Sequence, residues 1–344
     1  MAEVSVIVPV YNMAGDGKLE YCIRSLLGQT LKNLEIIAVD DASTDDSLEV
    51  LKGLEAENPG RLRVIASPDN RRQGGARNLG LDAAKDSDYV GFLDADDWAA
   101  PDLYERLLTL MKDTGADAAG CDLCRVGEHT MVPTKREECN GMSQTGVIDD
   151  KKRRSLLLNP GPVVTKLYRR EIFEGPALRF PERIAYEDNA IATAIVMRIR
   201  HYEHIPEPLY FYYQRPGSTT RSITIKQCED RMEAMRIMLR QAKEDGSFAK
   251  YHDEYESRFY LLFYRNTLLS YMQSDMKKDA GFLRGLGEEL LANFPDFRKN
   301  PYYLPQTNEE ERSLTDLQLR STGLFMIRYG LVRTYRRLRY GKQS

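Results

Sequence analysis

The chain has 344 residues, a formal net charge of −3 and 42% hydrophobic residues. This length allows one large domain with an appendage, or two domains. The slightly acidic balance gives no electrostatic reason to expect a nucleic-acid-binding protein, so no nucleic-acid partner is predicted.

The cysteines and the apolar runs indicate the compartment. Five cysteines are scattered along the chain, an odd number without the spacing of a disulfide framework: Cys22, Cys121, Cys124, Cys139 and Cys228. A reducing, cytoplasmic location is therefore expected. The single Cys-x-x-Cys pair has no second pair to complete a zinc site, so we interpret it as structural. The first residues lack the basic and apolar regions of a signal peptide, and no apolar run reaches the roughly 18 residues of a membrane-spanning helix, so neither secretion nor a membrane span is expected.

Apolar runs alternate with helical patterns in the first part of the chain. Residues 4–10 and 34–39 are almost continuously apolar, as in strands buried on both faces of a parallel sheet, and residues 62–66 supply a third strand. Apolar residues at helical spacing fill the intervals 19–26 and 48–54. Residues 74–84 predict a helix of small residues. This alternation implies a doubly wound parallel sheet with right-handed crossovers.

An acidic cluster ends the next apolar run, which begins at Tyr89. The run stops at Asp94, Asp96 and Asp97. In open α/β sheets, ligands bind outside the carboxyl ends of the strands, and Mg²⁺ or Mn²⁺ favours carboxylates shared with phosphate oxygens. The first hypothesis is therefore a site for a metal and a diphosphate. The alternative is that these aspartates form a turn or an N-cap before a helix at 103–111.

The regular alternation weakens in the second half of the chain. We expect a strand around 116–121, a loop or irregular hairpin at 135–143 and ordered structure again near Lys166. A helix is predicted to begin at or just before Glu187, followed by an edge strand at 206–213. Long amphipathic helices follow from Ile225 onward. A domain boundary is placed near residue 222, which separates an α/β domain (1–222) from a helical C-terminal region (223–344).

Five short motifs occur in order over the first 220 residues. They are residues 6–12 (Val-Ile-Val-Pro-Val-Tyr-Asn), 39–45 (Val-Asp-Asp-Ala-Ser-Thr-Asp), 75–80 (Gly-Ala-Arg-Asn-Leu-Gly), 92–97 (Phe-Leu-Asp-Ala-Asp-Asp) and 186–188 (Tyr-Glu-Asp). Because it contains these five motifs in this order, the chain resembles the family 2 glycosyltransferases. Later residues have only a general likeness to the helical extensions of capsule, lipopolysaccharide and teichoic-acid glycosyltransferases.

The resemblance implies both a fold and a reaction. The fold is GT-A, an α/β fold with a Rossmann-like, mostly parallel sheet flanked by helices, here with a helical C-terminal extension. The reaction is sugar transfer from a nucleotide-sugar, usually a UDP-sugar, to an acceptor hydroxyl with inversion at the anomeric carbon. A divalent ion held by carboxylates suits it, because the ion stabilises the charge that develops on the leaving diphosphate.

The resemblance also implies the roles of the acidic residues. Asp96 is expected to ligate Mg²⁺ or Mn²⁺, with Asp94 orienting the ion or the ribose, whereas Asp97 positions its neighbours. Asp188 is expected to be the base that takes the proton of the acceptor hydroxyl, with Glu187 beside it. The alternative for these last two residues is a simple preference of acidic side chains for a helix N-terminus.

The donor nucleotide is expected over the first two strand ends. Asp41 can accept a hydrogen bond from a uracil imide N–H, and the turn formed by Pro9, Tyr11 and Asn12 can supply backbone contacts to base and ribose. Arg77 has two open roles, since it can pair with a donor phosphate or fix the acidic cluster. Two further residues, Gln214 and Arg215, are candidates for a segment that closes over the diphosphate.

The C-terminal tail suggests a second hypothesis. Residues 320–342 contain seven Lys or Arg and no acidic residue, interleaved with apolar side chains. Such a helix can lie on an anionic membrane surface, which would bring the protein to lipid-linked acceptors at the inner face of the plasma membrane. The alternative is a helix that packs on the catalytic domain or in the interface of a homo-oligomer.

Taken together, these features predict a metal-dependent inverting glycosyltransferase that extends a cell-surface glycan from a nucleotide-sugar. Two rivals stay open. A sugar-nucleotide pyrophosphorylase would need a glycine-rich, basic loop after the first strand, where this chain has Tyr-Asn-Met-Ala at residues 11–14. A non-catalytic membrane-associated scaffold of the same fold would be expected to lack Asp96 or Asp188.

Overall fold

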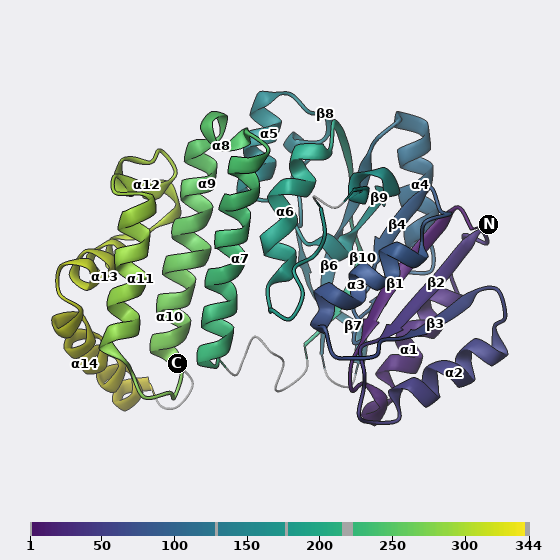
Figure 1. Cartoon of the computed structure of the whole chain (residues 1–344), viewed down its shortest axis with the longest axis horizontal. Helices are drawn as coiled ribbons and strands as arrows, with labels where there is room; N and C mark the ends of the chain where they lie inside the picture. Colours follow the sequence, from purple (N-terminus) through teal and green to yellow (C-terminus); the bar gives the residue numbers. More distant parts are fainter. Residues whose placement is uncertain (1, 128–129, 176–177, 215–222, 341–344) are drawn as a thin grey trace.

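A computed structural model describes residues 2–127, 130–175, 178–214 and 223–340, with all side chains in these ranges except those of 130–134 and 332–340. The chain forms a sheet flanked by helices, beside which a second group of helices is packed (Figure 1). The expected boundary at residue 222 falls in the range 215–222, which lies outside the described residues. The division into two domains therefore stays a prediction.

Within the described residues, one sheet contains ten strands: β1 (Val4–Val10), β2 (Leu34–Asp40), β3 (Leu62–Ala66), β4 (Tyr89–Phe92), β5 (Trp98–Ala99), β6 (Ala118–Gly127), β7 (Thr130–Glu137), β8 (Gly146–Val147), β9 (Lys166–Arg169) and β10 (His201–Tyr213). The main order is β3-β2-β1-β4-β9-β6-β10-β5, with β7 paired to β6 and β8 to β10. The first four strands of this order are parallel, whereas β9 is antiparallel to both β4 and β6. The strands in the first part of the chain thus agree with the sequence prediction.

β10 is a correction to the sequence analysis, because this strand does not lie at the edge. It pairs in parallel with β6 on one side and antiparallel with β5 and β8 on the other. The prolines at 206 and 208 cannot donate a hydrogen bond to a neighbouring strand, which usually confines proline to edge strands or bulges. The structure accommodates them where the register with β6 shifts, between Ile205 and Pro208 and again between Pro208 and Tyr210.

Helices cover both faces of the sheet. They are α1 (Lys18–Leu27), α2 (Ser47–Glu57), α3 (Arg72–Ala83), α4 (Leu103–Thr114), α5 (Asp150–Leu158) and α6 (Glu187–Arg198), with short 3₁₀ turns η1 (Ala14–Asp16), η2 (Met142–Gln144), η3 (Val163–Thr165) and η4 (Arg170–Phe173). Alternation along β1 explains the two layers, since successive side chains of a strand point to opposite faces. Val6 and Val8 pack in the cluster that contains residues of α1 and α4, whereas Ile7 packs in the cluster that contains residues of α3 and α6.

The C-terminal part of the described chain is helical, as expected from the sequence. Its elements are α7 (Ile225–Glu244), α8 (Ser247–Lys250), α9 (His252–Arg258), the π-helical η5 (Phe259–Arg265), α10 (Asn266–Gln273), α11 (Ala280–Asn293), η6 (Phe297–Lys299), α12 (Tyr303–Gln306), α13 (Glu309–Arg320) and α14 (Thr322–Tyr340). One buried cluster joins this part to the sheet, running from Ile7 through Ile191 of α6 to Met235 of α7 and on to Phe325 of α14. The helices are therefore packed on the sheet layer through α6.

Candidate functional site

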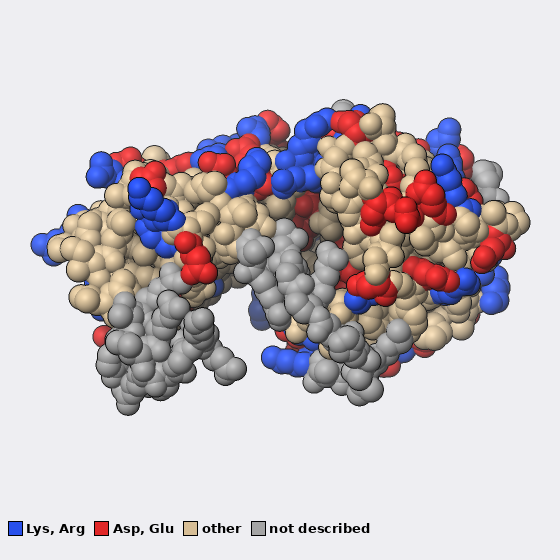
Figure 2. All heavy atoms as spheres, turned by 90° about the horizontal axis from the view of Figure 1, so that it is seen from below, with Lys and Arg blue, Asp and Glu red and all other residues tan. Residues whose placement is uncertain are grey.

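A large cavity opens at the carboxyl ends of the parallel strands. Its volume is about 650 Å³, within the usual range of small-molecule sites. Figure 2 views the molecule from this side and shows a hollow between the sheet region and the helical region, with acidic side chains in it. The lining residues are Pro9, Val10, Tyr11, Met13, Asp41, Asn70, Arg72, Gln73, Ala76, Asp94, Ala95, Asp96, Ile184, Ala185, Glu187, Tyr212, Thr224, Lys226 and Gln227.

The three aspartates after β4 are not equivalent. Asp94 and Asp96 are partly exposed and line the cavity, whereas Asp97 is buried. Both carboxylate oxygens of Asp97 accept hydrogen bonds from β10: Tyr210 Oη donates to Oδ2 at 2.5 Å, and the Tyr213 N–H donates to Oδ1 at 2.8 Å. Asp97 thus ties the acidic loop to the end of β10 and is not available to a ligand in the cavity.

Arg77 of α3 lies behind the carboxylates and does not itself line the cavity. Its guanidinium is buried and donates to Asp94 Oδ1 at 2.8 Å and to Glu187 Oε1 in a short contact. One cation therefore bridges the end of β4 and the start of α6. Burial raises the pKa of Glu187 to about 7, although Arg77 opposes this rise. Of the two roles left open by the sequence, the contacts favour fixing of the acidic cluster, and a contact to the donor stays a prediction.

Asp41, at the end of β2, has an unsatisfied oxygen at the cavity wall. Its Oδ1 accepts the Arg71 backbone N–H at 2.8 Å, whereas its buried Oδ2 has no hydrogen-bond partner among the described residues. Burial raises the pKa of Asp41, with the Arg71 N–H opposing. A buried acceptor without a donor is costly, so an N–H group of a ligand would stabilise it.

The turn after β1 is partly in the cavity. Pro9 and Tyr11 line it, and Tyr11 is 48% exposed. Asn12 is not among the lining residues, and its side-chain oxygen accepts the Thr44 N–H at 2.8 Å. Asn12 therefore joins the loops after β1 and β2.

Strained backbone surrounds this cavity. Five residues other than glycine have positive φ angles and line the cavity or directly adjoin a residue that lines it: Asn12 (52°), Ala42 (57°), Arg72 (60°), Arg183 (62°) and Tyr186 (64°). Such conformations are unfavourable for residues with a Cβ atom and tend to persist where a site requires a fixed backbone. Their positions agree with a functional role for these loops.

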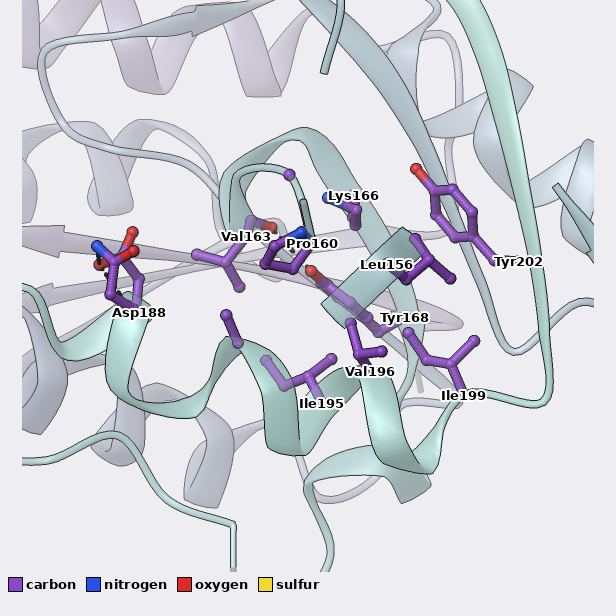
Figure 3. A pocket seen from close by; sticks show the side chains of 13 residues that line it. Leu156, Pro160, Val163, Lys166, Tyr168, Asp188, Ile195, Val196, Ile199 and Tyr202 are labelled. Carbon is purple, nitrogen blue, oxygen red and sulfur yellow. Dashed lines mark hydrogen bonds between the residues drawn. The ribbon is translucent and has the colours of Figure 1, made fainter. Parts of the chain in front are cut away.

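Asp188 lies at a separate, smaller cavity of about 50 Å³, between α6 and the segment around η3 (Figure 3). It shares this cavity with Lys166, Tyr168 and Tyr202. Burial lowers the pKa of Lys166 to about 8, and its Nζ donates to the Pro162 carbonyl at 2.9 Å. Asp188 Oδ1 accepts the Asn189 N–H at 2.7 Å. The structure thus separates the Glu-Asp pair, since Glu187 borders the large cavity and Asp188 the small one.

Several lining residues are absent from the sequence prediction. Arg72 of α3 donates to Asp230 of α7 at 2.9 Å, and Lys226 and Gln227 of α7 form part of the cavity wall. The N-terminus of α7 has a capping box between Thr224 and Gln227, which was readable in the sequence as a helix start but not as part of a site. The helical region therefore contributes to the cavity.

The remaining predicted residues lie elsewhere or outside the description. Gln214 is not among the lining residues, and its N–H donates to the Val126 carbonyl at 3.2 Å. Arg215 lies outside the described residues. His204 is buried against Asp122, with 2.9 Å between Nε2 and Oδ1, and lines neither cavity. These contacts give His204 a structural role.

The donor atoms at the cavity suit a hard divalent ion shared with a ligand. Asp94 and Asp96 offer two carboxylates, and Mg²⁺ is usually bound by one or two carboxylates together with phosphate oxygens and water. Another group of closely spaced donors, His252, Asp253 and Glu256, lies in the helical region on α9. It is not part of this cavity.

Comparison with known proteins gives consistent similarities. The family described as "Glycosyl transferase family 2" matches residues 5–175. An uncharacterized glycosyltransferase, EpsJ, of Bacillus subtilis is 33% identical over 63% of this chain and 62% of its own length. An uncharacterized glycosyltransferase of Haemophilus influenzae is 34% identical over 55% of this chain and 70% of its own length. The chain thus spans less than two thirds of the length of EpsJ, but 70% of the length of the Haemophilus influenzae protein.

Solved structures resemble the chain in fold. S. aureus TarS 1–349, in complex with UDP-GlcNAc, has a TM-score of 0.55 at 20% identity and covers 93% of this chain and 78% of its own. Mannosyltransferase PcManGT from Pyrobaculum calidifontis, in complex with GDP-Man and Mn²⁺, has a TM-score of 0.51 at 18% identity. The match covers 99% of this chain and 88% of the mannosyltransferase chain. At these identities the likeness concerns the fold alone, and it confirms the expected fold class.

Proposed function

Because the chain belongs to glycosyl transferase family 2, we propose that it transfers a sugar from a nucleotide-sugar, with a UDP-sugar as the expected donor, to a hydroxyl of a surface glycan or lipid-linked acceptor. The observation that supports this most directly is the convergence of Asp41, Asp94 and Asp96 on one cavity at the carboxyl ends of parallel strands. The pyrophosphorylase rival is not supported by this family membership.

The donor is proposed to lie across the large cavity with its base at β1 and β2. The Oδ2 of Asp41, which has no hydrogen-bond partner among the described residues, suits the imide N–H of uracil, and the exposed ring of Tyr11 lines the same cavity. The diphosphate would then reach the acidic loop after β4. Lys226, exposed at the N-terminus of α7 and paired with Asp230 at 2.7 Å, is a cation that also lines this cavity.

Asp94 and Asp96 are proposed to hold Mg²⁺ or Mn²⁺ together with the donor phosphates. When bound, the ion supplies positive charge that stabilises the leaving diphosphate. Arg77 fixes the position of Asp94, and Asp97 fixes the loop through Tyr210, so the two ligands are positioned before the donor binds.

Asp188 is proposed to take the proton from the acceptor hydroxyl in an inverting transfer. Glu187 is less suited to this step, because its Oε1 is bound to the buried guanidinium of Arg77. Glu187 would instead hold the start of α6 in place. Asp188, half-buried on the next position of the helix, lies on the side of α6 that faces the small cavity.

The test is a panel of nucleotide-sugars assayed for hydrolysis and transfer with Mg²⁺ or Mn²⁺. Asp188→Asn should lower transfer by about 10²–10⁴-fold, the usual contribution of a general base. Asp96→Asn should impair turnover and weaken activation by the metal. Asp86→Asn, an exposed carboxylate outside the cavity, is the matched control and should transfer sugar normally. Wild-type rates in Asp188→Asn would disprove the base, and full activity with a chelator would disprove the metal.

A further inference from the structure

The C-terminal helix α14 has two different sides. Phe325 is fully buried, and Met326 and Tyr329 pack against the same cluster, so one side holds the helix on the protein. On the other side, Leu324, Ile327 and Leu331 are 59%, 63% and 68% exposed. The helix is thus anchored along one side and presents an unpartnered apolar stripe along the other.

The spacing and charge of this segment are those of a helix at a membrane interface. The stripe of Leu324, Ile327 and Leu331 follows helical periodicity, and in the sequence the same spacing continues at Tyr335 and Leu338. Residues 320–342 contain seven Lys or Arg and no acidic residue, although the whole chain has a net charge of −3. A strongly basic helix with an exposed apolar stripe is typical of binding in the headgroup region of a bilayer.

The positive charge of residues 320–342 also distinguishes between two partners that could cover the apolar stripe, a second copy of the chain and a lipid surface. A second copy related by two-fold symmetry would bring the same basic segment against itself, which like charges oppose. Anionic lipid headgroups would neutralise these charges while the leucine and isoleucine side chains enter the acyl boundary. Within the described residues, no helix is long and apolar enough to cross a membrane. A surface contact is therefore the form of membrane binding that the segment supports.

We propose that α14 docks the protein on a bilayer that contains anionic lipids. In Figure 1, α14 and the carboxyl ends of the parallel strands lie toward the same lower side of the molecule. Because α14 is packed in the same buried cluster as residues of the sheet, docking through α14 would hold the large cavity close to the lipid surface. If the proposed function holds, on which this step rests, the acceptor hydroxyl belongs to a glycan linked to a membrane lipid.

The experiment is flotation of the full chain with vesicles of phosphatidylcholine alone or of equal parts phosphatidylcholine and phosphatidylglycerol. The wild-type protein should float with the anionic vesicles and not with the neutral ones, and added salt should weaken binding. The triple variant Leu324→Gln, Ile327→Gln and Leu331→Gln should bind at least about tenfold more weakly. The changed positions are exposed, so circular dichroism and thermal unfolding should match those of the wild type.

A matched control separates the stripe from general surface hydrophobicity. Leu304, 63% exposed on α12, is changed to Gln and should leave flotation unchanged. Equal flotation of the triple variant and the wild type, or of both vesicle types, would overturn the proposal. So would a wild-type dimer that the triple variant converts to a monomer, because the occupant would then be a second copy. Nucleotide-sugar hydrolysis without vesicles tests the proposed function separately, and the triple variant should retain it.

Discussion

Arg77→Met is expected to destabilise the fold strongly, and more so at high pH. The substitution removes the cation shared by Asp94 and Glu187 and replaces it with a shorter, uncharged side chain. The Arg77 and Glu187 side chains are only 3% and 5% exposed, so water cannot replace the lost contact at Glu187. Breaking a buried ion pair by removing one partner usually costs about 3–5 kcal/mol of the free energy of unfolding.

The pH dependence follows from the pKa of Glu187. This pKa is about 7 in the folded protein and has an ordinary value of 4.5. The folded state binds the proton more tightly, so this group makes the protein less stable as the pH rises through that interval. Without Arg77 the folded pKa rises further. The stability deficit of the variant should therefore be larger at about pH 8 than at about pH 6.

Urea denaturation followed by tryptophan fluorescence measures both effects. Trp98 is the single tryptophan of the chain, and it is buried beside Tyr21 and Phe211 near the acidic loop. Arg24→Met is the control, because Arg24 pairs with Glu20 on the surface and should have little effect. A variant as stable as the wild type, or a deficit that is the same at both pH values, would refute the reasoning.

Two further predictions concern packing around the acidic loop and α3. Tyr210→Phe leaves the buried Asp97 carboxylate without its hydroxyl donor and should cost about 1–3 kcal/mol in urea denaturation, whereas an unchanged midpoint would contradict a structural role for this bond. Gly80→Ala places a methyl group 2.4 Å from Ile7 Cγ2 and should lower the melting temperature. Gly53→Ala, with no atom within 4 Å of the added carbon, should stabilise its helix by about 0.5–1 kcal/mol. Equal effects of the two glycine substitutions on stability would contradict the expected clash between residue 80 and Ile7 of β1.

The sequence was sufficient for the parts of the fold that depend on local patterns. Continuous apolar runs identified the buried strands at residues 4–10 and 34–40, and the acidic residues after β4 identified one edge of the cavity. The prediction that residues 206–213 form an edge strand was wrong, because β10 is paired on both sides. No local signal shows that a register shift allows such a strand to pair on both sides.

The rest of the site depends on contacts between residues far apart in the chain. The Tyr210 hydroxyl binds Asp97 across 113 positions, and Arg77 reaches Glu187 across 110. Neither partner can be read from spacing, because the sheet order determines which strand ends meet. The separate cavity beside Asp188 and the contribution of α7 to the large cavity depend in the same way on packing of α6 and α7.

The buried cluster that continues through α6 restricts how such a protein can diversify. The family match ends at residue 175, before α6. The apolar side chains of α6 nevertheless pack against one face of the sheet and against α7. A helical region taken from a relative could not be joined to this sheet at residue 222 without a matching α6. In a chimera, the exchange point would have to precede Glu187, so that α6 and the helices beyond it are inherited as one unit.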